Sequence, residues 1–130
     1  MPINVLVVDD SMLIRHTVCR FLEERGFRVE SATNGVEALE LVSRVRPNLI
    51  ITDMCMPKMS GSEFITTLRE RADTLTIPIV ILSGRQSEFH GSEQRASFVI
   101  YKDIDIDAQL EKALRLVFGK TDSGRRIAES

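Results

Sequence analysis

Apolar residues in this chain gather in short runs, and more polar stretches separate one run from the next. Four runs are almost continuously apolar, which is typical of parallel strands covered on both faces. They are residues 5–8, 49–51, 79–82 and 98–101. Residues 27–30 alternate between apolar and polar side chains instead, as in a half-exposed edge strand. The pattern therefore predicts four inner strands and one edge strand.

Between the predicted strands, apolar residues recur at helical spacing and mark one face of each helix. The face residues are Ile14, Val18, Phe21 and Leu22 in the first helix, Phe64, Ile65, Leu68 and Ala72 in the third, and Leu110, Ala113, Leu114, Val117 and Phe118 in the last. Gly26 supplies a stop for the first helix, and Asn34 and Pro47 bound the second. Asp107 is the predicted N-cap of the last helix. The fourth helix would lie in residues 84–92, a short polar segment.

Strands and helices alternate throughout this pattern, which favours an α/β fold. Right-handed crossovers between parallel strands place helices on both faces of one sheet. We predict a doubly wound, five-stranded parallel sheet in the order 2-1-3-4-5, a flavodoxin-like (βα)5 fold, with the first and last helices on the same side. In such a sheet, ligands bind beyond the carboxyl ends of the strands, where the strand order reverses.

Composition and charge narrow the class of protein. The 130 residues suit one domain, and 17 basic and 19 acidic residues give a net charge of −2. No basic stripe indicates direct binding of nucleic acid. No apolar run reaches the roughly 18 residues that a membrane span needs. Cys19 and Cys55 match no metal or disulfide spacing, so we expect two free thiols in a cytoplasmic protein.

Reactive polar residues follow four of the predicted strands. Asp9 and Asp10 follow the first strand and Asp53 the third, while Ser83 follows the fourth and Lys102 the fifth. Because the carboxyl ends of parallel strands meet at one edge, we expect these side chains to share a pocket. Neighbouring carboxylates repel each other unless one takes a proton or a divalent cation lies between them. The lysine indicates that an anion binds as well.

Each of these residues, taken alone, has a simpler explanation. Either aspartate after the first strand could cap the following helix, and Ser11 would be an even better cap. Ser83 could bond to its own loop. These simpler explanations do not account well for all the residues together, because each would have to apply independently at four strand ends along the same edge of the sheet.

The polar residues also belong to longer motifs. These are Val7-Val8-Asp9-Asp10-Ser11, then Asp53 followed by Met56-Pro57-Lys58-Met59-Ser60-Gly61, then Ser83-Gly84, and finally Lys102. In this order they resemble the receiver domain of bacterial two-component response regulators. The resemblance covers residues 3–118. We therefore expect a receiver domain in residues 1–118 and a polar tail or the start of a linker in residues 119–130.

The resemblance implies a function for the pocket. Asp53 would accept a phosphoryl group from a phosphohistidine on a sensor histidine kinase or a phosphotransfer protein. Asp10, Asp53 and the backbone carbonyl of Cys55 would hold Mg²⁺, and Asp9 would orient a water on the ion. Such a protein is a switch that acts on a downstream effector or output domain. It is not an enzyme with an external metabolite as its substrate.

The resemblance also implies how phosphorylation changes the protein, and here the chain departs from the family pattern. Lys102 would pair with a phosphoryl oxygen, and Ser83 would move towards the phosphoryl group. The lysine is usually followed by proline, whereas Asp103 follows it here, so we expect a trans peptide bond. An aromatic residue that usually reports the movement is replaced by Val99. We expect Tyr101, on the same face of the strand, to take over part of that role.

Two other functions would use the same fold. A phosphorylation-independent interaction module is the main alternative, because Asp103 and the short fourth helix are unusual in this family. A flavodoxin-like binder of a nucleotide or flavin would need a glycine-rich or Ser/Thr-rich phosphate loop after the first strand. Asp9 and Asp10 place negative charge there instead, which disfavours that function.

Overall fold

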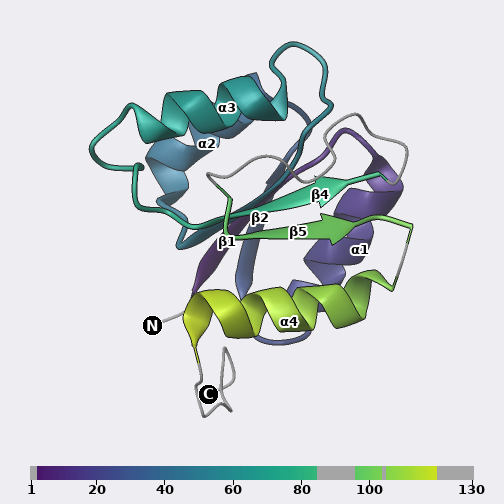
Figure 1. Ribbon diagram of the computed structural model, residues 1–130. Coiled ribbons are helices and arrows are strands. Elements are labelled where there is room, and N and C mark those ends of the chain that lie inside the picture. The colour runs from purple at the N-terminus through teal and green to yellow at the C-terminus, as the bar shows by residue number, and fades with distance from the viewer. Residues whose placement is uncertain (1–2, 85–95, 104, 120–130) are drawn as a thin grey trace.

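The computed structural model describes residues 3–84, 96–103 and 105–119. Its five strands are β1 (Asn4–Val8), β2 (Arg28–Ala32), β3 (Leu49–Asp53), β4 (Ile79–Ser83) and β5 (Phe98–Tyr101). They form one sheet in the order β2-β1-β3-β4-β5, and every adjacent pair is parallel (Figure 1). The predicted strand order is therefore confirmed.

The described residues contain four helices. They are α1 (Met12–Glu23), α2 (Gly35–Val45), α3 (Gly61–Arg69) and α4 (Ile106–Phe118). The predicted helix between β4 and β5 falls mainly on residues 85–95, which lie outside the described residues, so α4 corresponds to the last predicted helix. No helix within the described ranges combines the length and the hydrophobicity that a membrane crossing requires.

The helices cover the sheet in two layers, with α1 and α4 on one face and α2 and α3 on the other (Figure 1). In β1, Val5 and Val7 belong to the core beneath α1 and α4, whereas Leu6 and Val8 belong to the core beneath α2 and α3. All four side chains are fully buried. Successive residues enter opposite cores, which is the physical reason for the continuous apolar run.

β5 is an edge strand, as the predicted strand order implies, so the interpretation of its apolar run as an inner strand is wrong. Within the described ranges its only neighbour in the sheet is β4. Phe98, Val99 and Tyr101 stay partly exposed, while Ile100 is fully buried. A continuous apolar run indicates that helices cover both faces of a strand. It does not indicate whether the strand has a hydrogen-bonded neighbour along each edge. The prediction for β2, the other edge strand, is confirmed.

The start of α2 is confirmed, and the predicted start of α4 is wrong. The Asn34 side chain accepts a hydrogen bond from the Glu37 amide at 2.8 Å and caps α2. The N-cap of α4 is Asp105, whose carboxylate accepts from the Ala108 amide at 3.2 Å. Asp107 lies within the first turn, where its negative charge still favours the helix dipole.

The end of α3 also differs from its prediction. The helix ends at Arg69, so Ala72 is not part of its inner face and is exposed. The buried Thr74 donates its hydroxyl hydrogen bond to the Leu68 carbonyl at 2.6 Å. The Arg71 amide donates to the same carbonyl at 3.3 Å, so this helix end has its partners although the apolar spacing continues to Ala72.

Candidate functional site

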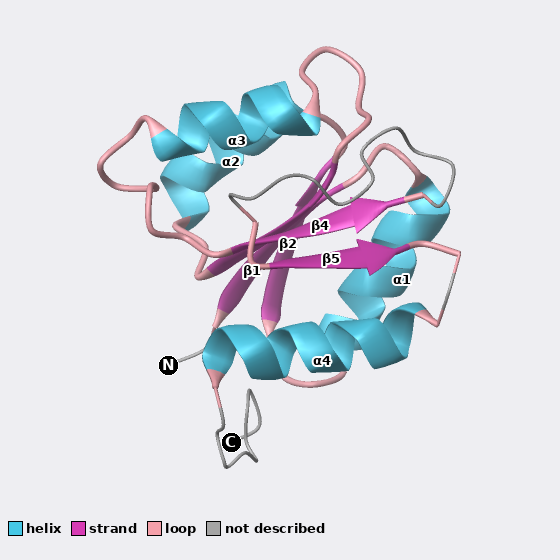
Figure 2. Ribbon diagram, viewed as in Figure 1, coloured by secondary structure: helices cyan, strands magenta, loops and turns pink. Residues whose placement is uncertain are grey.

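Three charged residues meet where β1, β3 and β5 end. Asp9 follows β1, Asp53 is the last residue of β3, and Lys102 follows β5. The Lys102 ammonium lies 2.9 Å from Asp9 Oδ2 and 3.1 Å from Asp53 Oδ1. Figure 2 shows that the arrows of β4 and β5 end at the same edge of the sheet. The structure thus joins residues from distant parts of the chain, as their positions at strand ends predicted.

Asp10 completes a cluster of carboxylates. Carboxylate oxygens of Asp9, Asp10 and Asp53 lie within 4.8 Å of one another, with Asp10 exposed and the other two buried. Asp9 Oδ1 accepts a hydrogen bond from the Ser11 amide at 2.8 Å. Asp9 Oδ2 is buried, and its partner in the described residues is the charged ammonium of Lys102. One ammonium against three carboxylates leaves negative charge in excess, which fits a hard divalent cation such as Mg²⁺.

Burial dominates the electrostatics of Asp53. It raises the pKa of Asp53 above the ordinary value of 3.8, and the negative charge of Asp9 adds to this shift. The Lys102 ammonium and a hydrogen bond from the Cys55 amide act in the opposite direction. A cation beside Asp53 would favour its charged form, which is the form that can act as a nucleophile.

Burial and nearby charges also set the pKa of Lys102, but here the nearby charges outweigh burial. Burial by itself would lower the pKa of Lys102, because it disfavours the charged ammonium. The hydrogen bonds and charges of Asp9 and Asp53 more than offset burial, so the pKa is raised above 10.5. Lys102 is therefore a permanent positive charge at neutral pH, held against two carboxylates.

Ser83 lies at the same edge, but its hydroxyl is bonded locally. It is the last residue of β4 and is buried. The hydroxyl donates to the Gly84 carbonyl at 3.2 Å, which is the simpler alternative for this residue. The Ser83 carbonyl accepts a hydrogen bond from the Lys102 amide at 2.8 Å. The backbones of Ser83 and Lys102 are thus adjacent at the end of the sheet.

The loop after Asp53 is shaped by a close approach of α3 to the end of β3. The Gly61 amide donates to the Met54 carbonyl at 2.9 Å. A Cβ at Gly61 would lie 2.6 Å from Met54 Cα and closer still to the Asp53 carbonyl oxygen, so the site needs glycine here. Cys55 in this loop and Cys19 in α1 are both free thiols, as predicted. The Cys55 carbonyl as a metal ligand stays a prediction.

Arg15 contacts the site and was not predicted from the sequence. This residue of α1 donates from Nη1 to the Asp9 carbonyl at 2.8 Å, so it holds the peptide group between Asp9 and Asp10. The sequence feature that could have indicated this contact is a basic residue, Arg15, in the helix directly after Asp9 and Asp10. That spacing does not reveal that the guanidinium folds back onto the backbone.

Comparison with protein families matches residues 5–115 to the response regulator receiver domain. The chain belongs to this family. Receiver domains act in two-component signalling, so the resemblance seen in the strand-end motifs is confirmed. The response regulator MprA of Mycobacterium sp. (strain KMS) is 41% identical over 87 residues, which are 67% of this chain and 37% of that relative. The matched part of the chain thus spans little more than a third of the length of this curated relative.

Solved structures agree with this assignment. The chemotaxis response regulator CheY4 of Vibrio cholerae superimposes with a TM-score of 0.78 at 31% identity, over 89% of this chain and 99% of that chain. The receiver domain of a signal transduction histidine kinase from Syntrophus aciditrophicus gives 0.77 at 29% identity, over 95% and 92% of the two chains. The predicted fold class is thereby confirmed.

Proposed function

We propose that this receiver domain is a phosphorylation-dependent switch. In it, the Asp53 carboxylate takes a phosphoryl group from a phosphohistidine on a sensor histidine kinase or a phosphotransfer protein. The observation that carries the proposal is the position of the Lys102 ammonium, 2.9 Å from Asp9 and 3.1 Å from Asp53. Phosphoryl transfer requires mainly positioning and neutralisation of charge, and Lys102 places a positive charge beside the proposed nucleophile.

In the proposed transfer, a carboxylate oxygen of Asp53 attacks phosphorus while the phosphorus–nitrogen bond to the donor histidine breaks. The product is an acyl phosphate. Lys102 would then move from the carboxylates to a phosphoryl oxygen. The Ser83 hydroxyl, which donates to Gly84 here, would donate to the phosphoryl group instead. This exchange would move the end of β4 and change the surface that a partner contacts.

We propose Mg²⁺ as the cofactor of this transfer. Asp10, Asp53 and the backbone carbonyl of Cys55 would hold the ion, and Asp9 would orient a water on it. When bound, Mg²⁺ would supply positive charge that neutralises the phosphoryl oxygens. The carboxylates of Asp9, Asp10 and Asp53 within 4.8 Å of one another and the raised pKa of Asp53 support this assignment, because a cation would offset the repulsion between them.

The proposed domain consists of residues 1–118, and residues 119–130 would be a polar tail or the start of a linker. Its partners would be the phosphoryl donor and a downstream effector or output domain, in the cytoplasm. The domain would assist its own phosphorylation and dephosphorylation without acting on an external metabolite.

Incubation with Mg²⁺ and acetyl phosphate, followed by intact mass spectrometry, tests the proposed function. The protein should gain the mass of one phosphoryl group, and either Asp53→Asn or added EDTA should abolish the gain. Asp73→Asn is the matched control, because this exposed carboxylate lies in the loop after α3. Undiminished labelling of Asp53→Asn would disprove Asp53 as the acceptor. No labelling of the parent protein would favour the phosphorylation-independent module.

A further inference from the structure

Gln109 of α4 is joined to the backbone of Tyr101, the residue that precedes Lys102. The Tyr101 amide donates to Gln109 Oε1 at 2.9 Å, and Gln109 Nε2 donates to the Tyr101 carbonyl at 2.9 Å. The same Nε2 also donates to the Asp105 carbonyl at 3.2 Å. One side-chain amide therefore satisfies both polar groups of Tyr101, as a neighbouring strand would, and ties the end of β5 to the start of α4.

The backbone amide and carbonyl of Tyr101 need a hydrogen-bond partner outside the sheet because β5 is an edge strand. Successive residues of a strand point their amides to opposite sides. The Lys102 amide points towards β4, where it donates to the Ser83 carbonyl at 2.8 Å, so the amide and carbonyl of Tyr101 point away from β4. In the described residues no strand lies on that side, and Gln109 takes its place.

We infer that Gln109 is a positioning residue for Lys102, and that it holds the end of β5 where the ammonium reaches Asp9 and Asp53. Ser83 fixes the backbone on one side of β5 and Gln109 fixes it on the other, directly before Lys102. The chain after Lys102 lacks the stiffening that a proline would give, since Asp103 is the next residue. The inference rests on the proposed function, in which Lys102 contacts the phosphoryl group.

Two affinities distinguish this role from a general contribution to folding. They are the affinity for Mg²⁺ alone and the affinity for beryllofluoride at saturating Mg²⁺, where beryllofluoride stands in for the phosphoryl group. Lys102 would contact the anion and not the metal. In Gln109→Met, which keeps the side-chain length but makes neither bond, beryllofluoride affinity should fall about tenfold while Mg²⁺ affinity stays within about twofold. Isothermal titration calorimetry measures both.

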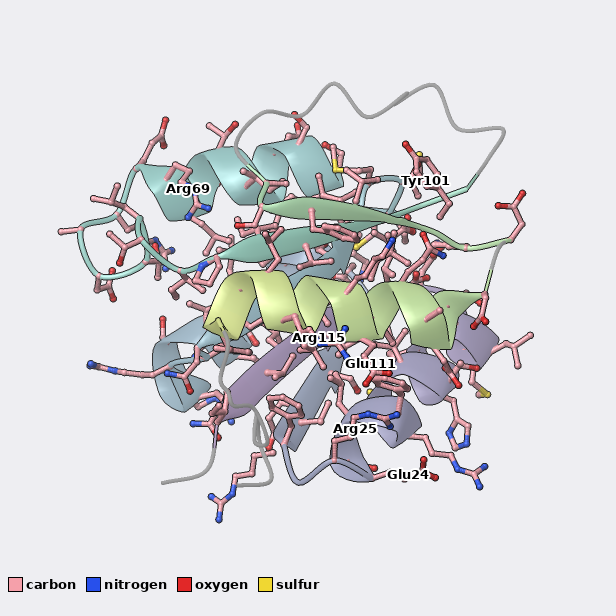
Figure 3. The ribbon with its side chains drawn as sticks, turned by 60° about the horizontal axis from the view of Figure 1, so that its bottom comes forward. Glu24, Arg25, Arg69, Tyr101, Glu111 and Arg115 are labelled. Carbon is pink, nitrogen blue, oxygen red and sulfur yellow. The ribbon has the colours of Figure 1, made fainter. Side chains whose placement is uncertain are left out.

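Three further variants sharpen the experiment. Gln109→Glu keeps an acceptor for the Tyr101 amide but has no donor for its carbonyl, so it should lose beryllofluoride affinity as well, and it serves if Gln109→Met fails to fold. Glu111→Met is the matched control, because Glu111 is exposed on α4 and pairs with Arg115 at 3.7 Å. Figure 3 shows this pair on α4, apart from Tyr101 on β5. In a Lys102→Met background, Gln109→Met should have no further effect on beryllofluoride binding.

The outcomes separate the inference from the proposed function. Equal beryllofluoride affinity in the parent and in Gln109→Met overturns the inference and leaves the proposed function intact. A parallel loss of Mg²⁺ and beryllofluoride affinity also overturns it, because the whole site would then have loosened. If the parent itself does not bind beryllofluoride in the presence of Mg²⁺, the proposed function fails, and the inference fails with it.

Discussion

Asp53 is buried in a setting that disfavours its negative charge. Its exposed fraction is 5%, and burial together with Asp9 raises its pKa above 3.8. A carboxyl group with a raised pKa holds its proton more tightly in the folded chain than in the unfolded chain. This group therefore favours the folded state at low pH, and the advantage is lost as the pH rises through the raised pKa. Above the raised pKa, the Asp53 carboxylate of the metal-free protein lowers the free energy of unfolding.

We therefore expect Asp53→Asn to stabilise the metal-free protein at pH 7. The free energy of unfolding should rise by roughly 1 kcal/mol, within the usual range of single stabilising substitutions. The gain should shrink as the pH falls through 3.8, because the unfolded carboxyl then takes up a proton as well. Urea unfolding in EDTA at several pH values measures the effect, with the exposed Asp73→Asn as control. A less stable variant at pH 7 would mean that pairing with Lys102 outweighs burial.

At the scale of elements, the junction between β3 and α3 holds the site together. The first turn of α3 packs against the backbone that follows Asp53, and Gly61 permits this contact because it has no Cβ. Gly84, at the end of β4, offers a contrast, since a Cβ there would meet none of the described residues within 4 Å. Two glycines of the receiver motif thus have different physical reasons to be present.

This contrast predicts different effects on stability. Gly61→Ala should lower the free energy of unfolding by about 2 kcal/mol, because backbone atoms of Asp53 and Met54 cannot move aside without disturbing β3. Gly84→Ala should change it by less than about 0.5 kcal/mol. Chemical denaturation of both variants beside the parent measures the difference. Similar losses in the two variants would contradict the close approach at Gly61.

At the scale of the whole molecule, the proposed switch must carry a change from Ser83 to the surface. Ser83 on β4 lies opposite Tyr101 on β5 in the sheet register. Val99, two residues earlier on the same face as Tyr101, packs against the core under α2 and α3. Tyr101 is partly buried, and Figure 3 shows its side chain near the end of β5. We therefore expect Tyr101 to be the aromatic residue that responds to the proposed movement of Ser83.

We expect the Tyr101 ring to change its rotamer and its exposure when the site is occupied. As the Ser83 hydroxyl leaves Gly84 for the phosphoryl group, space opens beside Tyr101 and the ring should fill it. Crystal structures of the metal-free protein and of its complex with Mg²⁺ and beryllofluoride make the comparison. If the ring keeps one rotamer and one exposure while Ser83 moves, Tyr101 does not report the switch.

Much of this protein follows from the sequence alone. The apolar runs predict the strands because each residue of an inner parallel strand enters one core or the other, as Leu6 and Val7 do. The position of Asp9, Asp53 and Lys102 after strands predicts their meeting, because a doubly wound sheet brings the strand ends to one edge. Both features follow from local patterns and a topology rule, because neither depends on how individual side chains dock.

Other features depend on how the helices dock onto the sheet. α3 ends before Ala72, where the Thr74 hydroxyl and the Arg71 amide both donate to the Leu68 carbonyl, although the apolar spacing continues. Arg15 and Gln109 look like surface residues in the sequence, yet each binds backbone of the site. Periodicity shows which face of an element is buried. It does not show which backbone group a long polar side chain will reach, because docking in three dimensions sets that distance.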